Sequence, residues 1–246
     1  MIANAKLRTA SDPVFRHACG FCLLEEWCWP PGLEESDLNR LHAIVRHTGL
    51  LPPGRHLFRA DDPFTAIYAV RNGCIKSYTT DLQGHEHVRD FHLPGELFGF
   101  DAAYPDHHHF NALIIKAATV CIIPYRDIAV LSRRIPGLQT QILALMSREF
   151  SRQQLFAEGA NATQQVAIFL LDLEARLRRQ YRTDYDLELP MSYENIANYL
   201  RFSPETMSRV ISKLQQLGVI EVNLRHICLV DVARLSLIAQ GAPLEH

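Results

Sequence analysis

The sequence predicts an α+β protein in which an all-β roll is followed by a long helix and then by a unit of short helices and paired strands. Three patterns support this prediction. Turn signals recur roughly every 9–11 residues between Pro53 and Pro124. Apolar residues then repeat at alternating steps of three and four along a helical segment. Beyond that segment, two short amphipathic helices precede two alternating strands.

Length and composition fit a folded protein with one large or two modest cores. The chain has 246 residues, of which 48% are hydrophobic and 21% charged. It contains no run of about 18 apolar residues that would span a membrane, and Arg8, Asp12 and Arg16 interrupt the region where a signal peptide would be apolar. We therefore expect a cytoplasmic protein that does not enter a membrane. The net charge of −2 gives no sign of nucleic acid, so any DNA contact must depend on a local surface.

The N-terminal part divides into an arm and a roll. Residues 1–32 are rich in Pro and Gly and lack periodicity, which predicts an irregular arm. Residues 33–135 form the predicted roll, which begins with an amphipathic helix from Glu34 to about Arg46. Short runs of β-forming residues follow between the turn signals, and Asn72-Gly73 is the strongest hairpin signal among them.

Residues 136–160 are predicted to be a dimerisation helix. Apolar and small side chains follow the spacing of a coiled-coil seam: Leu143, Met146, Phe150, Gln153, Ala157 and Ala160. A helix packed on its own domain would show a similar stripe. Pairing with a second copy is favoured because the helix is longer than one small roll needs. The expected interface residues of the homodimer are Leu143, Met146, Phe150 and Gln153.

Residues 161–246 are predicted to form a second domain. A helix after Asn161 ends in four arginines that suit a helix C-terminus and could also contact phosphate, namely Arg176, Arg178, Arg179 and Arg182. A short strand is expected over 185–190. Ser192 then caps a helix that runs to Leu200.

A second short helix begins at Ser203, which caps it, and has Pro204 at its first position. Its two faces differ sharply in chemistry. One face carries Met207, Val210, Ile211, Leu214 and Leu217, and the opposite face carries Glu205, Ser208, Arg209, Ser212 and Gln216. Arginine can bind guanine with two hydrogen bonds, glutamate can accept one from cytosine, and serine can do either. The outward face therefore suits the recognition helix of a helix-turn-helix protein in the major groove.

Any solvated amphipathic helix would show the same two faces, so the residues that follow it matter. Residues 219–222 and 226–230 alternate around a turn at 223–225, which predicts a β-wing directly after the helix. Helix-turn-helix followed by a wing is the layout of a DNA reader. The sequence shows no nucleophile–base arrangement and no glycine-rich phosphate loop, so we do not expect an enzyme.

The two helices resemble a known recognition element. Residues 196–200 (IANYL) and 204–210 (PETMSRV) are similar to those of FNR-type anaerobic regulators in the CRP/FNR superfamily, and the resemblance extends over nearly the whole chain. It implies a cyclic-nucleotide-binding-like β-roll sensor domain, a long dimerisation helix and a C-terminal winged helix-turn-helix. It also implies that Glu205, Ser208 and Arg209 read inverted repeats of TTGAT in double-stranded DNA, and that RNA polymerase is a partner.

The cysteines suggest a metal site, because six cysteines in a reducing compartment are free thiols or metal ligands more often than disulfides. Cys19, Cys22 and Cys28 form C-x2-C-x5-C in the arm, and Cys121 lies in the last expected strand of the roll. Four thiolates suit either zinc or an iron–sulfur cluster. The resemblance to FNR-type oxygen sensors implies a [4Fe–4S] cluster on these four residues. Cys74 and Cys228 are expected to be ordinary buried thiols.

The function that the resemblance implies is an oxygen-responsive global transcription regulator of anaerobic metabolism, which binds DNA as a dimer while its cluster is intact. The alternative is a regulator of the same type that is gated by nitric oxide or a small ligand, with zinc on the cysteines. A cyclic nucleotide fits poorly, because Gly95-Glu96 is present but residues 108–113 contain no Arg for the phosphate. We expect His107, His108 and His109 to form a polar loop. Gln153 stands where FNR-type sensors carry an acidic residue, so we expect the oxygen-driven loss of the dimer to be weaker or to depend on other residues.

Overall fold

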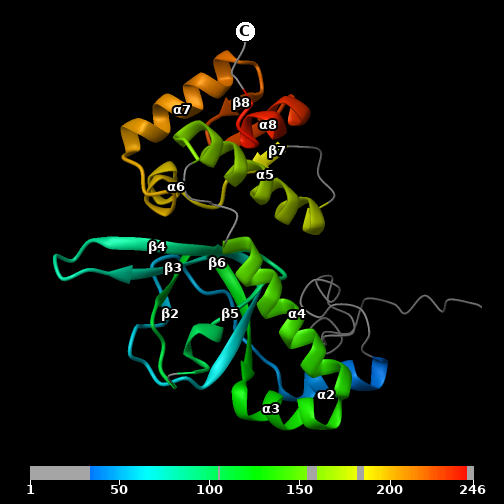
Figure 1. Ribbon diagram of the computed structural model, residues 1–246. Coiled ribbons are helices and arrows are strands. Elements are labelled where there is room, and N and C mark those ends of the chain that lie inside the picture. The colour runs from blue at the N-terminus through cyan, green and yellow to red at the C-terminus, as the bar shows by residue number, and fades with distance from the viewer. Residues whose placement is uncertain (1–33, 105, 154–159, 182–185, 243–246) are drawn as a thin grey trace, which may run out of the picture.

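The computed structural model describes residues 34–104, 106–153, 160–181 and 186–242. The described chain consists of a roll flanked by three helices and, above it in Figure 1, a C-terminal unit of helices and a small sheet. None of the helices in these ranges is long and apolar enough to cross a membrane.

The roll is built from a six-stranded sheet in which β1, β6, β3 and β4 are neighbours in that order, while β2 pairs with β6 and β5 pairs with β3. The strands are β1 (Arg46–His47), β2 (His56–Phe58), β3 (Ala66–Thr80), β4 (Glu86–His92), β5 (Leu97–Phe98) and β6 (Asn111–Pro124), with the 3-10 helix η3 (Phe100–Ala102) between β5 and β6. The long antiparallel pair β3–β6 runs from Ala66 opposite Pro124 to Tyr78 opposite Asn111. All pairings of the roll are antiparallel. The all-β roll that the regular spacing of the turn signals predicted is therefore confirmed.

The prediction of a hairpin turn at Asn72-Gly73 was wrong. Both residues lie inside β3, where the register with β6 shifts. Gly73 has φ of 86°, and a Cβ there would lie 2.3 Å from the Ala117 carbonyl oxygen. Glycine is therefore required for an irregularity within a long strand, not for a turn. The hairpin itself joins β3 to β4 through residues 81–85.

The side chains of β6 alternate between two cores. Val120 lies inside the roll with Phe58, Tyr68 and Phe98. Its neighbour Cys121 lies on the outer face, in a core that the flanking helices cover. This alternation is the two-residue period of a strand with both faces buried.

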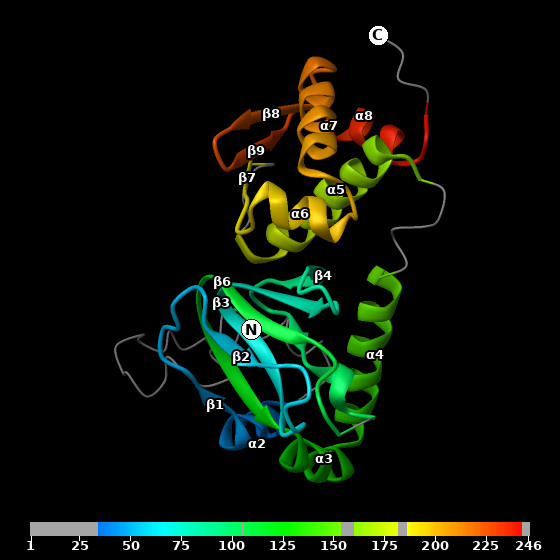
Figure 2. The same cartoon turned by 90° about the vertical axis from the view of Figure 1, so that its left-hand side faces the viewer.

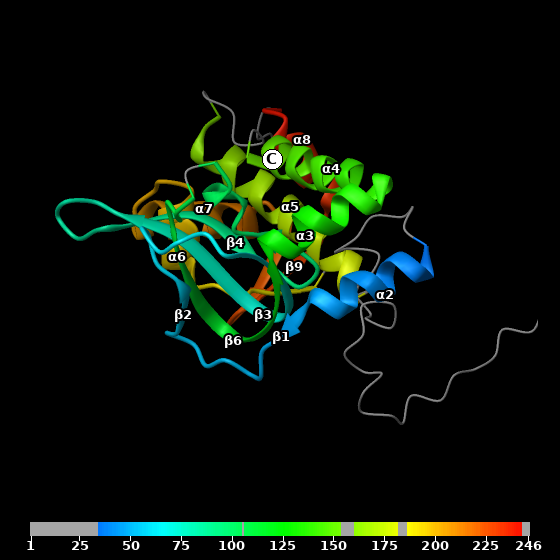
Figure 3. The ribbon, with the colours of Figure 1, turned by 90° about the horizontal axis from the view of Figure 1, so that it is seen from below.

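Three helices cover that outer face: α2 (Glu35–Ile44), α3 (Tyr125–Arg134) and α4 (Pro136–Gln153). Figure 3 shows them together along one side of the roll. The predictions of α2 and of the described part of α4 are confirmed. Helix α3 was not predicted.

The C-terminal unit contains α5 (Ala162–Tyr181), β7 (Asp186–Glu188), α6 (Tyr193–Tyr199), α7 (Pro204–Gln216), β8 (Ile220–Asn223), β9 (His226–Leu229) and α8 (Val232–Ala239). Its sheet has the order β7-β9-β8. In Figures 1 and 2, α6 lies next to β4 of the roll and α7 lies farther from it.

One hydrophobic core joins the C-terminal unit to the roll. It contains Cys74, Val88, Phe91 and Leu93 of the roll together with residues of α5, α6, α7 and α8. The recognition helices therefore rest on the sheet through a continuous apolar contact, which limits how they can turn relative to the roll.

Candidate DNA-binding face and cysteine site

The two short helices begin as their capping residues predicted. The Ser192 hydroxyl accepts a hydrogen bond from the Asn195 N–H at 3.1 Å, and the Ser203 hydroxyl accepts one from the Thr206 N–H at 3.2 Å. Between the helices, Arg201 adopts a left-handed conformation with φ of 61°. The caps and this turn fix the angle at which α7 leaves α6.

Helix α7 has the two faces that the sequence predicted. Met207, Val210, Ile211 and Leu214 are buried against the core of the unit. On the opposite side, the three predicted reading residues are exposed, namely Glu205, Ser208 and Arg209. The structure therefore brings these three together near the N-terminal end of the helix, with their polar groups directed away from the protein.

The exposed face combines both signs of charge. A hydrogen bond from the Ser203 hydroxyl, with smaller help from Arg209, lowers the pKa of Glu205. Arg209 donates a hydrogen bond from Nη2 to the Thr206 hydroxyl at 3.2 Å. Glu205 is therefore an ionised acceptor at neutral pH, and Arg209 is a partly oriented donor.

The predicted wing is confirmed. Strands β8 and β9 pair from Ile220 opposite Leu229 to Asn223 opposite His226. Leu224, at the turn, has φ of 56° and is exposed. The predicted short strand is also present as β7, and it extends the wing to three strands by pairing with β9.

One of the four arginines near the end of α5, Arg176, does not have the phosphate-contacting role that the sequence allowed. Arg176 is buried, with its side chain 6% exposed, and it binds Glu96 of the roll through two hydrogen bonds of 2.7 Å. Arg178 pairs with Glu174 on the same helix. Arg176 therefore cannot contact DNA phosphate, and the side chains of Arg179 and Arg182 lie outside the described residues.

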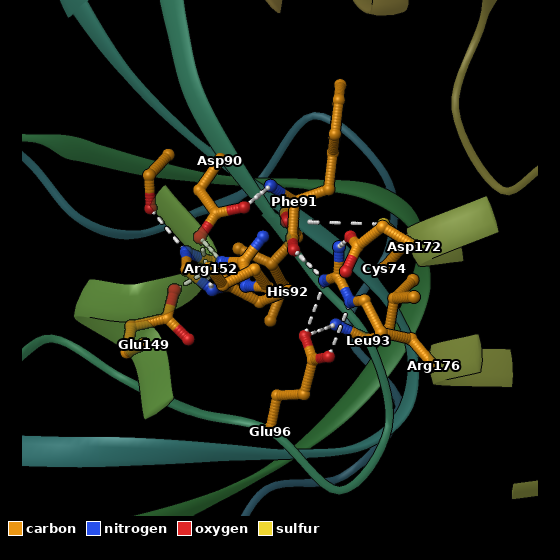
Figure 4. Close-up of polar contacts among 12 residues, drawn as sticks. Cys74, Asp90, Phe91, His92, Leu93, Glu96, Glu149, Arg152, Asp172 and Arg176 are labelled. Atoms are coloured by element: carbon orange, nitrogen blue, oxygen red, sulfur yellow. Dashed lines mark hydrogen bonds and ion pairs between the residues drawn. The ribbon is translucent and has the colours of Figure 1, made fainter. Parts of the chain in front are cut away.

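Two charged clusters lie where α4 and α5 contact the roll, and the sequence predicted neither as a site (Figure 4). In one, Arg176 contacts Glu96, Asp172 and the Phe91 carbonyl. In the other, Arg152 of α4 contacts Asp90 and Glu149. Among the residues of these clusters, Glu96 and the arginine Arg176 were singled out in the sequence. Glu96 was noted because Gly95-Glu96 is half of a nucleotide-binding pattern. The Glu96 carboxylate is instead bound by an arginine of this chain.

The four predicted cluster ligands can be followed only in part, because Cys19, Cys22 and Cys28 lie outside the described residues. Cys121 lies in β6, directly opposite His47 of β1 and Ala69 of β3. Its side chain is buried, and its Sγ lies 3.3 Å from the His47 Nδ1. The histidine beside this thiol was not singled out in the sequence.

The other two cysteines differ from Cys121. Cys74 is fully buried in β3, and burial raises the pKa of its thiol far above the usual value. This confirms the expectation of an ordinary buried thiol. Cys228 lies in β9 as expected but is partly exposed, so the prediction of burial was wrong there.

The three consecutive histidines differ in their surroundings. The His108 ring is buried and stacks on Phe58, with ring centroids 3.7 Å apart. His107 and His109 are exposed. All three lie in the loop between η3 and β6, as expected.

Helix α4 leaves part of its predicted seam uncovered. Leu143 is 67% exposed, Met146 42% and Phe150 66%, whereas Leu138 and Leu145 face the roll and are buried. Gln153 ends the helix, and its side chain lies outside the described residues.

Comparison with known proteins agrees with this architecture. A family model described as a Crp-like helix-turn-helix domain matches residues 164–238, and one described as a cyclic nucleotide-binding domain matches residues 50–134. The fumarate and nitrate reduction regulatory protein of Vibrio cholerae is 36% identical over 220 residues, which cover 88% of each chain. The transcriptional activator protein anr of Pseudomonas aeruginosa is 34% identical over 226 residues, which cover 91% of this chain and 93% of the relative.

Among solved structures, FixK2 from Bradyrhizobium japonicum has the same fold, with a TM-score of 0.72 at 24% identity, over 81% of this chain and all of that chain. The relatives are transcription regulators and not enzymes. The fold, the exposed face of α7 and this similarity over most of the sequence together show that the chain belongs to the CRP/FNR family of DNA-binding transcription regulators.

Proposed function

We propose that this regulator responds to oxygen and controls anaerobic metabolism. In this proposal it binds TTGAT-type inverted repeats as a homodimer while a [4Fe–4S] cluster on Cys19, Cys22, Cys28 and Cys121 is intact. The name of the Vibrio cholerae relative, which refers to fumarate and nitrate reduction, supports a role in the anaerobic response. As a bacterial-type regulator of transcription, it would work in the cytoplasm with RNA polymerase.

The observation that carries the proposal is the outward face of α7. Glu205, Ser208 and Arg209 are exposed together, while the opposite face of the same helix is buried. A bidentate contact from Arg209 to guanine and an acceptor from Glu205 to cytosine would suit the GA step of TTGAT and its complement. The wing follows at once and would lie beside the DNA backbone.

The environment of Cys121 is compatible with a role as ligand. Its sulfur lies on a strand that is paired on both sides, so the ligand position is well fixed. A ring N–H from His47 at 3.3 Å would stabilise the thiolate that a cluster needs. When bound, an oxygen-labile cluster would supply the redox chemistry through which oxygen is sensed.

The exposed seam of α4 supports pairing with a second copy. Leu143, Met146 and Phe150 present an apolar stripe that an isolated chain would leave in water. Pairing α4 with its symmetry mate would place two recognition helices on adjacent turns of the major groove. With Gln153 in place of an acidic residue, we expect like-charge repulsion at this point to be absent, so other residues must weaken the dimer in oxygen.

The test is anaerobic binding to a duplex with two TTGAT half-sites and to a scrambled duplex, over a series of salt concentrations. Losing one bidentate base contact costs about 1–3 kcal/mol, and a symmetric dimer loses it twice. Arg209→Ala should therefore weaken binding to the TTGAT duplex at least about 30-fold, and binding to the scrambled duplex much less, because phosphate contacts remain.

Arg133→Ala is the matched control, since Arg133 is exposed on α3 of the roll, far along the chain from α7. It should leave both affinities unchanged. Equal weakening of both duplexes by Arg209→Ala, with a lower salt slope, would identify Arg209 as a phosphate contact and contradict the proposed reading role.

A further inference from the structure

Strand β4 lies at one edge of the sheet. It is the last strand in the order β1-β6-β3-β4, so one of its edges has no strand partner among the residues that the structure describes. Edge strands present backbone N–H and C=O groups that must be satisfied in another way. Here side chains from the C-terminal unit bind these groups.

Asn198 of α6 makes the first of these contacts. Its Nδ2 donates to the Glu86 carbonyl at 2.7 Å, and its Oδ1 accepts from the Val88 N–H at 2.7 Å. A side-chain amide has a donor and an acceptor side by side, so it makes the same pair of bonds as a neighbouring strand. Because α6 is the first helix of the helix-turn-helix, this contact attaches the C-terminal unit directly to the sheet. We call this unit the recognition unit below.

Arg176 of α5 makes the second contact. Its Nε and Nη2 each donate to a different oxygen of Glu96 at 2.7 Å, and Nη2 also donates to the Phe91 carbonyl. A planar guanidinium bound to both oxygens of a carboxylate is fixed in orientation as well as in position. The Leu93 N–H donates to the same carboxylate at 2.9 Å, which holds Glu96 in place.

Aromatic side chains close the space between these contacts. The ring of Phe91 lies 5.5 Å from that of Tyr199 and 6.4 Å from that of Phe169, and the last two are 5.9 Å apart. Packing of this kind excludes water, and polar contacts beside it are stronger than contacts at an exposed surface.

The same strand also holds the predicted dimerisation helix. Arg152 of α4 pairs with Asp90, and the other oxygen of Asp90 accepts from the Phe91 N–H at 2.7 Å. Two consecutive residues of β4 therefore contact different helices: Asp90 contacts α4, and Phe91 contacts α5 (Figure 4).

We propose that Arg176 and Asn198 are positioning residues for DNA reading. Through Glu96, Phe91 and the free edge of β4 they fix the recognition unit relative to α4, and so they set the separation of the two recognition helices in a dimer. We call these contacts the β4 junction. This inference rests on the proposed function only for the choice of the DNA probe. In that probe, two half-sites must lie about one helical turn apart for both recognition helices to bind.

The first test needs neither DNA nor cluster. Hydrogen exchange of the Val88 amide is measured in wild type, Asn198→Ala and Arg176→Gln. Exchange at Val88 should be at least about 10-fold faster in both variants, since the junction acts as a unit. Because Arg176→Gln leaves Glu96 without its cation, Glu96→Gln/Arg176→Gln is measured as well. This double variant should have a higher free energy of unfolding than Arg176→Gln but show the same fast exchange at Val88.

Lys116→Gln is the matched control. Lys116 pairs with Glu188 across the same two parts of the chain, but this pair is half exposed. Its loss should leave exchange at Val88 unchanged. Wild-type protection of Val88 in the double variant would overturn the proposal, as would equally fast exchange in Lys116→Gln.

The second test uses duplexes in which one or two base pairs are added between the half-sites. Wild type should bind the lengthened duplexes at least about 10-fold more weakly than the original, and Asn198→Ala and the double variant should discriminate less than about 3-fold. Wild-type spacing preference in both variants would overturn the positioning role. Failure of wild type to bind any TTGAT duplex would instead contradict the proposed function, and the exchange experiment would still decide the junction.

Discussion

Arg152 lies between two carboxylates with different ionisation. Burial opposes the charge on Asp90, but the neighbouring guanidinium outweighs it and lowers the pKa of Asp90 well below its usual value. Burial, and then repulsion from Asp90, raises the pKa of Glu149 to about 7. One arginine therefore stabilises one ionised carboxylate fully and leaves the second partly protonated near neutral pH.

A dependence of stability on pH follows from Glu149. Because its pKa is raised in the folded state, its stabilising contribution is complete below the unfolded value near 4.5 and is lost as the pH rises through about 7. Glu149→Gln cannot ionise, so between pH 5 and 8 the variant should gain about 2–3 kcal/mol relative to wild type. Urea unfolding of both proteins at several pH values measures this difference.

Glu221→Gln controls for the general loss of one negative charge, since Glu221 is exposed on β8. Its difference from wild type should be nearly constant over the same range. A constant difference for Glu149→Gln would contradict the interpretation of the cluster.

Individual residue roles could be predicted where they depend on local chemistry. Ser192 and Ser203 cap their helices because a hydroxyl there satisfies a free N–H. Arg176 was misassigned because its partner lies 80 residues earlier in the chain. A terminal arginine on an amphipathic helix carries no local sign of the carboxylate that binds it.

Helix α4 has two apolar faces in different surroundings. Leu138 and Leu145 attach the helix to the roll, and Leu143, Met146 and Phe150 remain exposed. The helix is thus held by its own domain and still offers a second apolar stripe. This arrangement suits a dimer interface that is carried on a rigid support.

Phe150→Glu should disrupt that interface. The substitution would place two like charges in an apolar contact, and burying unpaired charge costs about 3 kcal/mol or more, which is roughly 100-fold in the dissociation constant. Anaerobic sedimentation should show a monomer. Ala144→Glu, on an exposed side of α4 away from the seam, should remain a dimer. A dimeric Phe150→Glu protein would show that the copies pair elsewhere.

Most elements could be predicted from periodicity and caps, including α2, α7, β7 and the wing. Two expectations show the limit of such patterns. Asn72-Gly73 is typical of a hairpin, but here the glycine permits the close approach of β6 within one strand. Helix α3 follows directly after a long apolar strand, so its own short apolar period did not stand out.

At the scale of the whole molecule, three parts of the chain meet at β4. The roll contributes the strand, α4 contributes Arg152, and the recognition unit contributes Arg176 and Asn198. Strand β4 therefore connects the roll, α4 and the DNA-binding helices, beside the shared apolar core and the Lys116–Glu188 pair. This convergence is a tertiary property, and no sequence pattern along the chain indicated it.

In the function that we propose, an oxygen-labile cluster controls DNA binding. The direct measurement follows visible absorption and binding to the TTGAT duplex in one anaerobic sample, before and after exposure to air, for wild type, Cys121→Ala and Cys74→Ala. We predict a broad visible band and tight binding in wild type and Cys74→Ala, with both lost together in air, and neither in Cys121→Ala. A colourless wild-type protein that contains zinc and binds the duplex equally with and without air would contradict the proposed function.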